Sequence, residues 1–432
     1  MRASLNDYVA PGVLGRVGNV PYLGPVSTRT YFNDTQISST AGWNCQTAHY
    51  ARDDIVALRL IFSNNYVIPG TGETAQGGTS TTTASVVYNG TAVQATFNGG
   101  STSIVIPSGA TILSDLIPIG IPKGSLHLTR RFQVNSSKLL FVSNATTRKI
   151  NTALGDAVAS SSTDRTMIGG IVDSGGGAMI PPQGIIAYTK LSTIGAIGSS
   201  RMAGFKDTVV DASGNTGYTR MFGDYFAYMD YSVGGDTNAS VSGSGGAIRR
   251  GLIKAYCSHL WLDPGLNDLN LGGTAAADLS CLSAMINEWP WGPSNVIVND
   301  ESAWTTSSDL WTTTTGQATR TTFEPQRVLL NAGIAALTGL NQKVIVSDLD
   351  GTGTNSQFWK NPVDGGSQTT PDGIHENSSQ CIFIAGSGRF NPSLVRARDP
   401  LPVAPAGSSN LLGSDNAPYL KGADGNYLFG VG

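Results

Sequence analysis

An aspartate and a histidine lie three residues apart near the end of the sequence, in the segment TTPDGIHENSSQC at residues 369–381. Asp372 and His375 belong to a polar, glycine-containing stretch of a chain that has only four histidines. Side chains three positions apart share one face of a turn, so the Asp372 carboxylate can accept an imidazole N–H. That contact fixes the tautomer and leaves the other ring nitrogen free to take a proton from a hydroxyl. The pair therefore indicates the base of a hydrolase, and the alternative is a solvated loop histidine.

Three other segments place serine, glycine or asparagine at the end of a predicted strand or the start of a predicted helix. Their candidate residues are Gly198, Ser199 and Ser200 in IGSSRMAG, Ser232 and Gly234 in YSVGGDT, and Gly265 and Asn267 in PGLND. Serine supplies a nucleophile, an asparagine amide supplies a hydrogen-bond donor, and glycine permits tight turns. Each segment alone also has an ordinary explanation as a helix cap, a glycine turn or an Asx turn.

Together with the histidine segment, these loops resemble the four blocks of the SGNH/GDSL hydrolase family. The blocks of that family supply a Ser, a Gly, an Asn and a His in this chain order, and the resemblance covers about half of the chain. It implies that Ser200 is the nucleophile of a catalytic triad with His375 and Asp372. It also implies an oxyanion hole formed by the backbone N–H groups of Ser200 and Ser232 and by the side chain of Asn267.

Three positions depart from the pattern of the family. Ser199 stands where the family has aspartate, so Ser199 stays an alternative nucleophile to Ser200. Ser232 stands where the family has glycine, but the expected donor is a main-chain N–H, which any residue except proline can supply. Glu376 follows the histidine at the position where the family usually has proline.

The reaction implied by the resemblance is two-step acyl transfer through an acyl-enzyme, with no metal and no organic cofactor. Fold and triad do not select among esters. The favoured substrate is an ester of a short acyl or acetyl group, and a glycan stays open as the alcohol that carries it. Transfer of the acyl group to an alcohol instead of water stays open. So does a non-catalytic binding or structural protein, such as a phage tail or adhesin component, on the same scaffold.

The first part of the chain, residues 1–184, has the pattern of β-strands. Short runs rich in Val, Ile and Thr alternate apolar and polar residues, and Gly, Asn, Pro and Ser separate them. Asn89-Gly90 predicts a tight hairpin because this dipeptide readily adopts the positive φ angles of a type I′ turn. The spacing predicts a jelly-roll-like β-sandwich, which would be a carbohydrate-binding or positioning module.

The second part, residues 185–398, alternates buried-strand patterns with helical ones, among them a predicted helix over 217–229. This alternation predicts a three-layer α/β/α domain with a parallel sheet. In such sheets functional residues collect in loops at the carboxyl ends of the strands, where the candidate residues lie. The Pro-, Gly- and Ser-rich segment 399–432 predicts an extended arm that packs on the body or mediates oligomerisation.

Composition and charge limit the classes of partner and the kinds of site that this protein can have. A net charge of −3 without a basic block argues against nucleic acid, and no stretch approaches the ~20 apolar residues of a membrane helix. Only 13% of residues are charged and 54 are glycine, which is typical of extracellular or virion proteins, although the N-terminus shows no secretory signal. Four scattered cysteines predict isolated thiols, with neither a zinc site nor a disulfide framework. The segment DLDGTG at 348–353 lacks the later ligands of a calcium loop.

Overall fold

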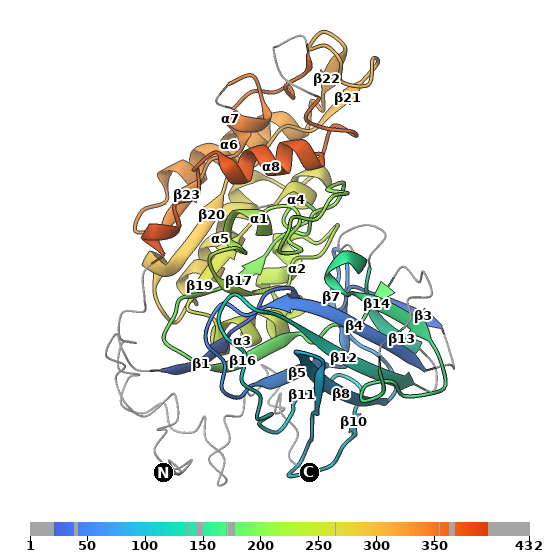
Figure 1. The fold of residues 1–432 in the computed structure, drawn as a ribbon. Coiled ribbons are helices and arrows are strands. Elements are labelled where there is room, and N and C mark those ends of the chain that lie inside the picture. The colour runs from blue at the N-terminus through green and yellow to red at the C-terminus, as the bar shows by residue number, and fades with distance from the viewer. Residues whose placement is uncertain are drawn as a thin grey trace.

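The computed structural model describes residues 21–395, apart from gaps at 39–41, 136–137, 144–149, 170, 172–177, 264, 354 and 363–367. The predicted arm over 399–432 lies outside the described residues. Figure 1 shows the antiparallel strands of the first part of the chain in the lower half of the molecule, and the helices and parallel strands of the second part above them.

The β part contains two larger antiparallel sheets. One sheet has the order β1 (Tyr22–Pro25), β16 (Gly184–Thr189), β5 (Arg59–Ser63), β11 (Thr111–Leu113). The other has the order β10 (Ile104–Ile106), β8 (Ser80–Tyr88), β12 (Leu126–Asn135), β4 (Trp43–Tyr50), β14 (Ala157–Ser160), and β9 (Thr91–Gln94) pairs with β8. Smaller pairings join β3 (Thr35–Ser38), β13 (Lys138–Ser143) and β15 (Ala178–Met179), and join β6 (Asn65–Ile68) to β7 (Gly72–Ala75).

The two larger sheets share one hydrophobic cluster. Leu60 and Phe62 of β5 pack in it together with Ala84 and Val86 of β8, as expected when alternate residues of a strand face the core. The predicted hairpin at Asn89-Gly90 is confirmed, because both residues have positive φ (48° and 76°) between β8 and β9. The jelly-roll topology stays a prediction.

The predicted parallel sheet is confirmed. Its order is β2 (Thr30–Tyr31), β18 (Ala227–Asp230), β17 (Thr193–Ile197), β19 (His259–Leu262), β20 (Val296–Asn299), β23 (Gln342–Val344), and every neighbouring pair is parallel. The four central strands are buried along their whole length. Burial on both faces explains why they appear in the sequence as nearly continuous apolar runs.

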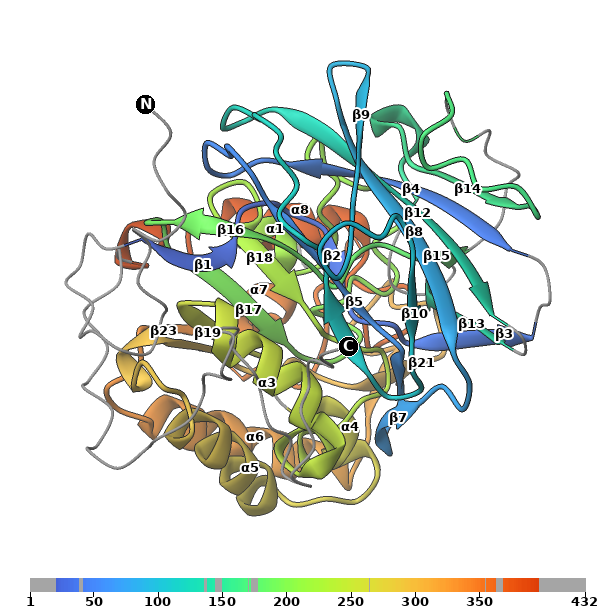
Figure 2. The same cartoon turned by 90° about the horizontal axis from the view of Figure 1, so that it is seen from below.

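Helices cover both faces of this sheet (Figure 2). One hydrophobic cluster joins the sheet to α3 (Ala247–Tyr256), α5 (Ala275–Asn287) and α6 (Phe323–Ala336). A second cluster joins the opposite face to α1 (Thr219–Phe222), α7 (Ser347–Asp350) and α8 (Ser378–Gly386). The short helices α2 (Asn238–Ser242) and α4 (Leu266–Asn270) and the hairpin β21 (Thr305–Ser307) to β22 (Gln317–Thr319) lie in the connections.

Two sequence expectations need correction or refinement here. The predicted helix over 217–229 was wrong: only the single turn α1 is helical, and the chain then enters β18, whose four residues are all buried in the sheet. The predicted boundary between 184 and 185 falls inside β16, which pairs with β1 and β5 of the β part. Conversely, β2 comes from the first part of the chain but forms the edge of the parallel sheet.

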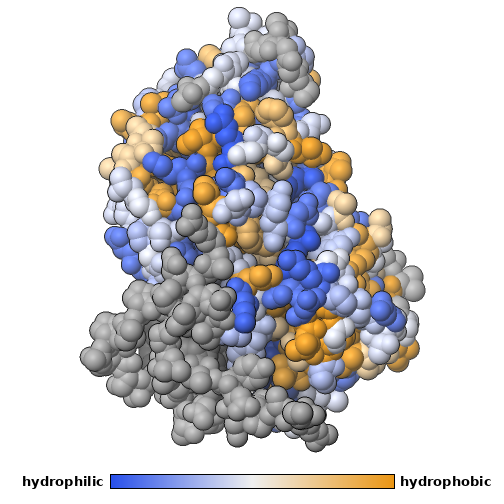
Figure 3. Space-filling model, turned by 60° about the vertical axis from the view of Figure 1, so that its left-hand side comes forward, coloured by the Kyte–Doolittle hydropathy of each residue, from blue (hydrophilic) through white to orange (hydrophobic). Residues whose placement is uncertain are grey.

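The surface is mixed in polarity, and the cysteines are free, as their scattered positions in the sequence predicted. On the face shown in Figure 3, hydrophobic and hydrophilic residues are interspersed over the α/β part. All four cysteines are free thiols, and Cys45, Cys257 and Cys381 are buried. Among the described residues, no helix has both the length and the apolar character needed to cross a membrane.

Candidate active site

The corner after β17 presents two adjacent serines. Gly198 follows the strand, and a Cβ at this position would lie 2.4 Å from the Cβ of Asp263, so only glycine fits between the ends of β17 and β19. The next residues form a tight turn, in which the N–H of Phe205 donates to the carbonyl of Ser200 at 2.8 Å. The turn places Ser200 at the carboxyl edge of the parallel sheet.

Ser200, His375 and Asp372 form a continuous chain of hydrogen bonds. Ser200 Oγ lies 2.8 Å from His375 Nε2, and His375 Nδ1 lies 2.9 Å from Asp372 Oδ2. Ser200 and His375 are buried, with 6% and 8% of their surface exposed. The sequence predicted these three residues and both contacts from spacing and family resemblance, and the structure brings all three together.

Asp372 is held as an anion by its own loop. Its Oδ1 accepts the backbone N–H groups of Ile374 at 3.0 Å and His375 at 2.9 Å, while Oδ2 faces the imidazole. Partial burial opposes the charge, but the hydrogen bonds from His375 and from these N–H groups outweigh it and lower the pKa of Asp372. A carboxylate in this position orients the ring and stabilises an imidazolium when one forms.

The two serines of the corner have different partners. Ser199 donates both its backbone N–H (3.0 Å) and its hydroxyl (2.8 Å) to Asp263 Oδ2, at the end of β19. Asn299 donates to the other oxygen of Asp263 at 2.7 Å. Only Ser200 contacts the imidazole, so the geometry favours Ser200 over Ser199 as the nucleophile. Asp263 was missed at the sequence level, because nothing in the sequence pairs it with a residue 64 positions away.

Asn267 lies near the start of α4, close to the turn of the second loop. Its side-chain nitrogen donates one N–H to the carbonyl of Asp236 at 2.7 Å and carries a second N–H. Gly265 precedes α4 where a Cβ would lie 1.6 Å from the carboxylate of Asp278, so a side chain cannot fit there. The structure thus joins the second and third loops, while the role of Asn267 toward an oxyanion stays a prediction.

The backbone of Ser232 has another partner in the structure. Its N–H donates to Asp230 Oδ1 at 3.1 Å, so it already has an acceptor. The turn that reaches Asn267 comes later, over residues 233–236, and contains Gly234 and Gly235, the latter with φ +81°. The Gly-Gly-Asp run was the available signal for this turn, but the sequence alignment with the family placed the donor earlier.

These loops surround a common space. A small cavity is lined by residues of the first three loops, namely Ile197, Gly198, Ser199, Asp236, Thr237, Asn238, Val241, Asp263 and Gly265. The ring of Phe205 lies against the ring of His375 with centroids 4.5 Å apart. Phe205 is therefore a further residue of the site that the sequence analysis missed.

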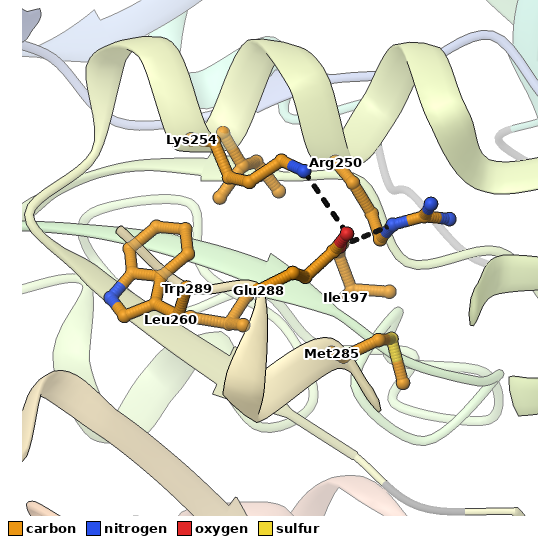
Figure 4. Close-up of a pocket in the computed structure, with 8 residues that line it drawn as sticks. Ile197, Arg250, Lys254, Leu260, Met285, Glu288 and Trp289 are labelled. Atoms are coloured by element: carbon orange, nitrogen blue, oxygen red, sulfur yellow. Dashed lines mark hydrogen bonds and ion pairs between the residues drawn. The ribbon is translucent and has the colours of Figure 1, made fainter. Parts of the chain in front are cut away.

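The pocket drawn in Figure 4 belongs to helix packing. Arg250 and Lys254 of α3 reach Glu288, at the end of α5, at 2.6 Å and 3.2 Å, above apolar side chains. The lining residues are Ile197, Arg250, Ile253, Lys254, Leu260, Met285, Glu288 and Trp289. None of the triad residues lines this pocket.

The other histidines are buried in strands. His49 contacts the Thr28 carbonyl and the Thr129 hydroxyl, each at 2.8 Å. Burial lowers the pKa of His127 to about 4, and His259 lies 2.9 Å from the hydroxyl of its neighbour Ser258.

No family model matches the sequence, and a search of curated proteins gives no match. Solved structures that resemble it include a lipolytic G-D-S-L family member from Veillonella parvula (15% identity, TM-score 0.32, 46% of this chain and 96% of that one). Another is Est24, a carbohydrate acetylesterase from Sinorhizobium meliloti (13%, 0.31, 46% and 97%). A Bacillus subtilis protein is similar over 88% of this chain and 93% of its own, at 12% identity and a TM-score of 0.32.

Proposed function

We propose that this protein is a serine esterase of the SGNH/GDSL type, which hydrolyses carboxylic esters through an acyl-enzyme. One observation supports the proposal above all others: the hydrogen-bonded chain from Ser200 through His375 to Asp372. The serine and the histidine are 175 positions apart in the sequence, so the fold and not the local chain brings them together. A hydroxyl, an imidazole and a carboxylate in this order are the elements of nucleophilic acyl transfer.

The mechanism begins with attack of Ser200 Oγ on the ester carbonyl while His375 Nε2 accepts the hydroxyl proton. The tetrahedral intermediate collapses, the C–O bond to the alcohol breaks, and the imidazolium gives its proton to the departing alkoxide. Water, deprotonated by His375, then attacks the acyl carbonyl; the bond to Ser200 Oγ breaks, the imidazolium returns its proton to that oxygen, and the acid leaves. Asp372 holds the ring in the required tautomer through both steps.

The negative charge on the carbonyl oxygen needs donors that are already in place. We assign this role to the N–H of Ser200, the second side-chain N–H of Asn267 and a backbone N–H of the 233–236 turn. This replaces Ser232, because its N–H is donated to Asp230, whereas Asp236 of the later turn accepts from Asn267. One such donor typically contributes about 3 to 4 kcal/mol of transition-state stabilisation.

The substrate is expected to carry a small acyl group, such as acetyl, and a glycan is the favoured alcohol. The support is steric: Ser200 and His375 expose little surface, and Phe205 lies against the imidazole. A short acyl chain needs the least room between these side chains. The glycan part rests on composition and on the β part as a carbohydrate-binding module, which stays a proposal.

The first test compares hydrolysis of p-nitrophenyl acetate by the wild-type protein and by Ser200→Ala. We expect turnover in the wild type and a fall of more than about 1000-fold in kcat for the variant, because the attacking atom is removed. p-Nitrophenyl octanoate and an acetylated xylose serve as comparison substrates for acyl length and alcohol. Equal rates for wild type and variant would support the alternative of a non-catalytic binding protein.

A further inference from the structure

Arg201 connects the nucleophile to the loop that holds the base. It follows Ser200 directly and exposes only 1% of its surface. Its guanidinium donates through Nε (3.0 Å) and Nη2 (2.9 Å) to the carbonyl of Ile374, the residue directly before His375. Arg201, next to Ser200, therefore binds the backbone of Ile374, next to His375, through two hydrogen bonds.

Buried acids complete the setting of this arginine. Nη1 of Arg201 pairs with Glu301, and Nε lies 3.6 Å from Glu376 Oε1, which also accepts the hydroxyl of Tyr218 at 2.8 Å. Burial opposes the charge of the guanidinium, but Glu301 and Glu376 outweigh it and hold the pKa of Arg201 well above its usual value. A buried charge is retained only when paired and hydrogen-bonded, and these contacts meet that condition.

Glu376 directly follows His375. Arg201 therefore contacts the residues on both sides of the base, the carbonyl of Ile374 before it and the side chain of Glu376 after it. In the family that the sequence resembles, this position usually holds proline, which would restrict the backbone of the residue before it. Here the carboxylate of Glu376 has Arg201 and Tyr218 as partners, which proline could not bind. The contacts of the Glu376 side chain with Arg201 and Tyr218 thus stand at a position where the family usually has the rigid ring of proline.

The carbonyl of Gly373, the residue before Ile374, is also held by hydrogen bonds. Gly373 O accepts the indole N–H of Trp359 at 2.9 Å and the backbone N–H of Thr305 at 2.9 Å. The ring of Trp359 also lies 5.4 Å from the guanidinium carbon of Arg201. The histidine loop is therefore anchored at two successive carbonyls, and Arg201 is the anchor that also belongs to the nucleophile corner.

We propose that Arg201 and Glu376 are a positioning pair that sets the distance between Ser200 and His375. The pair touches neither the substrate nor the reacting atoms, and it acts by docking the histidine loop on the corner after β17. This inference rests on the proposed esterase function. It predicts that weakening the pair lowers the rate of acyl transfer without weakening the binding of a small ester.

The test uses Arg201→Lys and Glu376→Gln, assayed with p-nitrophenyl acetate and by the rate of labelling with a fluorophosphonate, which reports the reactivity of Ser200. Lysine keeps the charge but cannot donate in the same fork, and glutamine keeps the shape without the charge. We expect kcat and the labelling rate to fall together by about 10- to 100-fold with little change in KM, because a small misplacement of catalytic groups costs this much. Arg29→Lys is the matched control.

Arg29 is as buried as Arg201 and is paired with Asp156 at 2.6 Å; it directly precedes β2 and also donates to the carbonyl of Ala48 in the β part. At a comparable loss of thermal stability, Arg29→Lys should keep its kcat. If both Arg201→Lys and Glu376→Gln fail to fold, Tyr218→Phe removes only the hydroxyl that holds Glu376 and should lower kcat about two- to tenfold.

The outcomes separate the two proposals. A wild-type protein that neither turns over the ester nor reacts with the fluorophosphonate refutes the esterase, and the positioning role with it. An active, labelled wild type whose folded variants keep both rates refutes the positioning role alone. A loss equal to that of Arg29→Lys at matched stability also refutes it, because the effect is then a general one of buried arginines.

Discussion

At the scale of single residues, the partner of each side chain separates two hydroxyls that look alike in the sequence. Ser199 donates a hydrogen bond to a carboxylate, while Ser200 faces an imidazole. Asp263 supplies that carboxylate from the neighbouring strand end, and burial raises its pKa against the hydrogen bonds from Asn299 and Ser199. The aspartate that the family has at position 199 is thus replaced by a serine bound to an aspartate at position 263.

Ser199→Ala tests this division of roles. The variant loses the hydroxyl donated to Asp263 but keeps the backbone N–H, so it should retain kcat within about tenfold of the wild type. Its stability should fall by about 1.5 to 3 kcal/mol, the usual contribution of a hydrogen bond to a charged group. Hydrolysis of p-nitrophenyl acetate and thermal unfolding measure the two effects. A loss of activity as complete as that of Ser200→Ala would assign the nucleophile to Ser199 instead.

The sequence permitted prediction of the side chains that make up the site more readily than of their supports. Asp372 and His375 could be chosen from residue type and spacing, and Ser200 from the resemblance of its loop to the first block of the SGNH/GDSL family. The backbone donor could not, because the direction of an N–H depends on the local turn, and the turn over 233–236 is not encoded by a single residue type. Asp263 and Arg201 were missed because their partners lie on other strands and loops.

At the scale of elements, parallel strands bring the loops together. The loops after β17, β18 and β19 leave the sheet at the same edge, as functional loops do in open α/β sheets. The helices α3, α5 and α6 were predictable from their period, since the buried residues of each recur every three or four positions along one face. The segment 217–229 was not, because a short buried strand after one helical turn has no period of its own to distinguish it.

Asp278 on α5 supports the second and third loops, and its contribution to the free energy of unfolding depends on pH. It accepts the amide of Asn238 at 2.6 Å, and burial, with a smaller repulsion from Asp268, raises its pKa to about 7. In the unfolded chain this pKa returns to 3.8, so between these values the folded state binds more protons than the unfolded state. The contribution of Asp278 to stability is therefore greatest at low pH and is lost as the pH rises through this window, by up to about 1.4 kcal/mol per pH unit.

Asp278→Asn should remove that loss. We expect the variant to gain stability over the wild type at pH 8 and to gain much less at pH 4.5, as measured by thermal unfolding at both pH values. Asp309→Asn is the control, because hydrogen bonds from Thr313 and Ser307 lower the pKa of Asp309 to about 2, outside the tested range. An equal difference at both pH values for Asp278→Asn would contradict the raised pKa.

At the scale of the whole molecule, the β part reaches the candidate oxyanion hole. Glu73 on β7 accepts the backbone N–H of Arg249 at 2.8 Å and its Nε at 3.1 Å, and Arg249 in turn pairs with Asp236 at 2.8 Å. Asp236 is the residue whose carbonyl holds Asn267. This chain of contacts indicates that the β part supports the site, in addition to any role in binding a glycan.

Glu73→Gln tests that support. Glutamine keeps the shape of the side chain but weakens both contacts with Arg249, so the 233–236 turn is held less firmly. We expect kcat for p-nitrophenyl acetate to fall about three- to tenfold with KM unchanged, since a small ester does not need a glycan site. Glu288→Gln breaks the pairs of the same helix with Arg250 and Lys254 and should leave kcat unchanged. Equal behaviour of the two variants would make the β part a separate module.

The short strand β2 has a consequence for dividing the molecule. It comes from residues 30–31, yet it closes the margin of the parallel sheet beside β18. Expressing the α/β part without the β part would therefore remove β2. The backbone N–H and C=O groups on the outer side of β18 would then have no strand to pair with. An uncovered margin of that kind invites self-association, so the α/β part is not expected to behave as an independent unit in isolation.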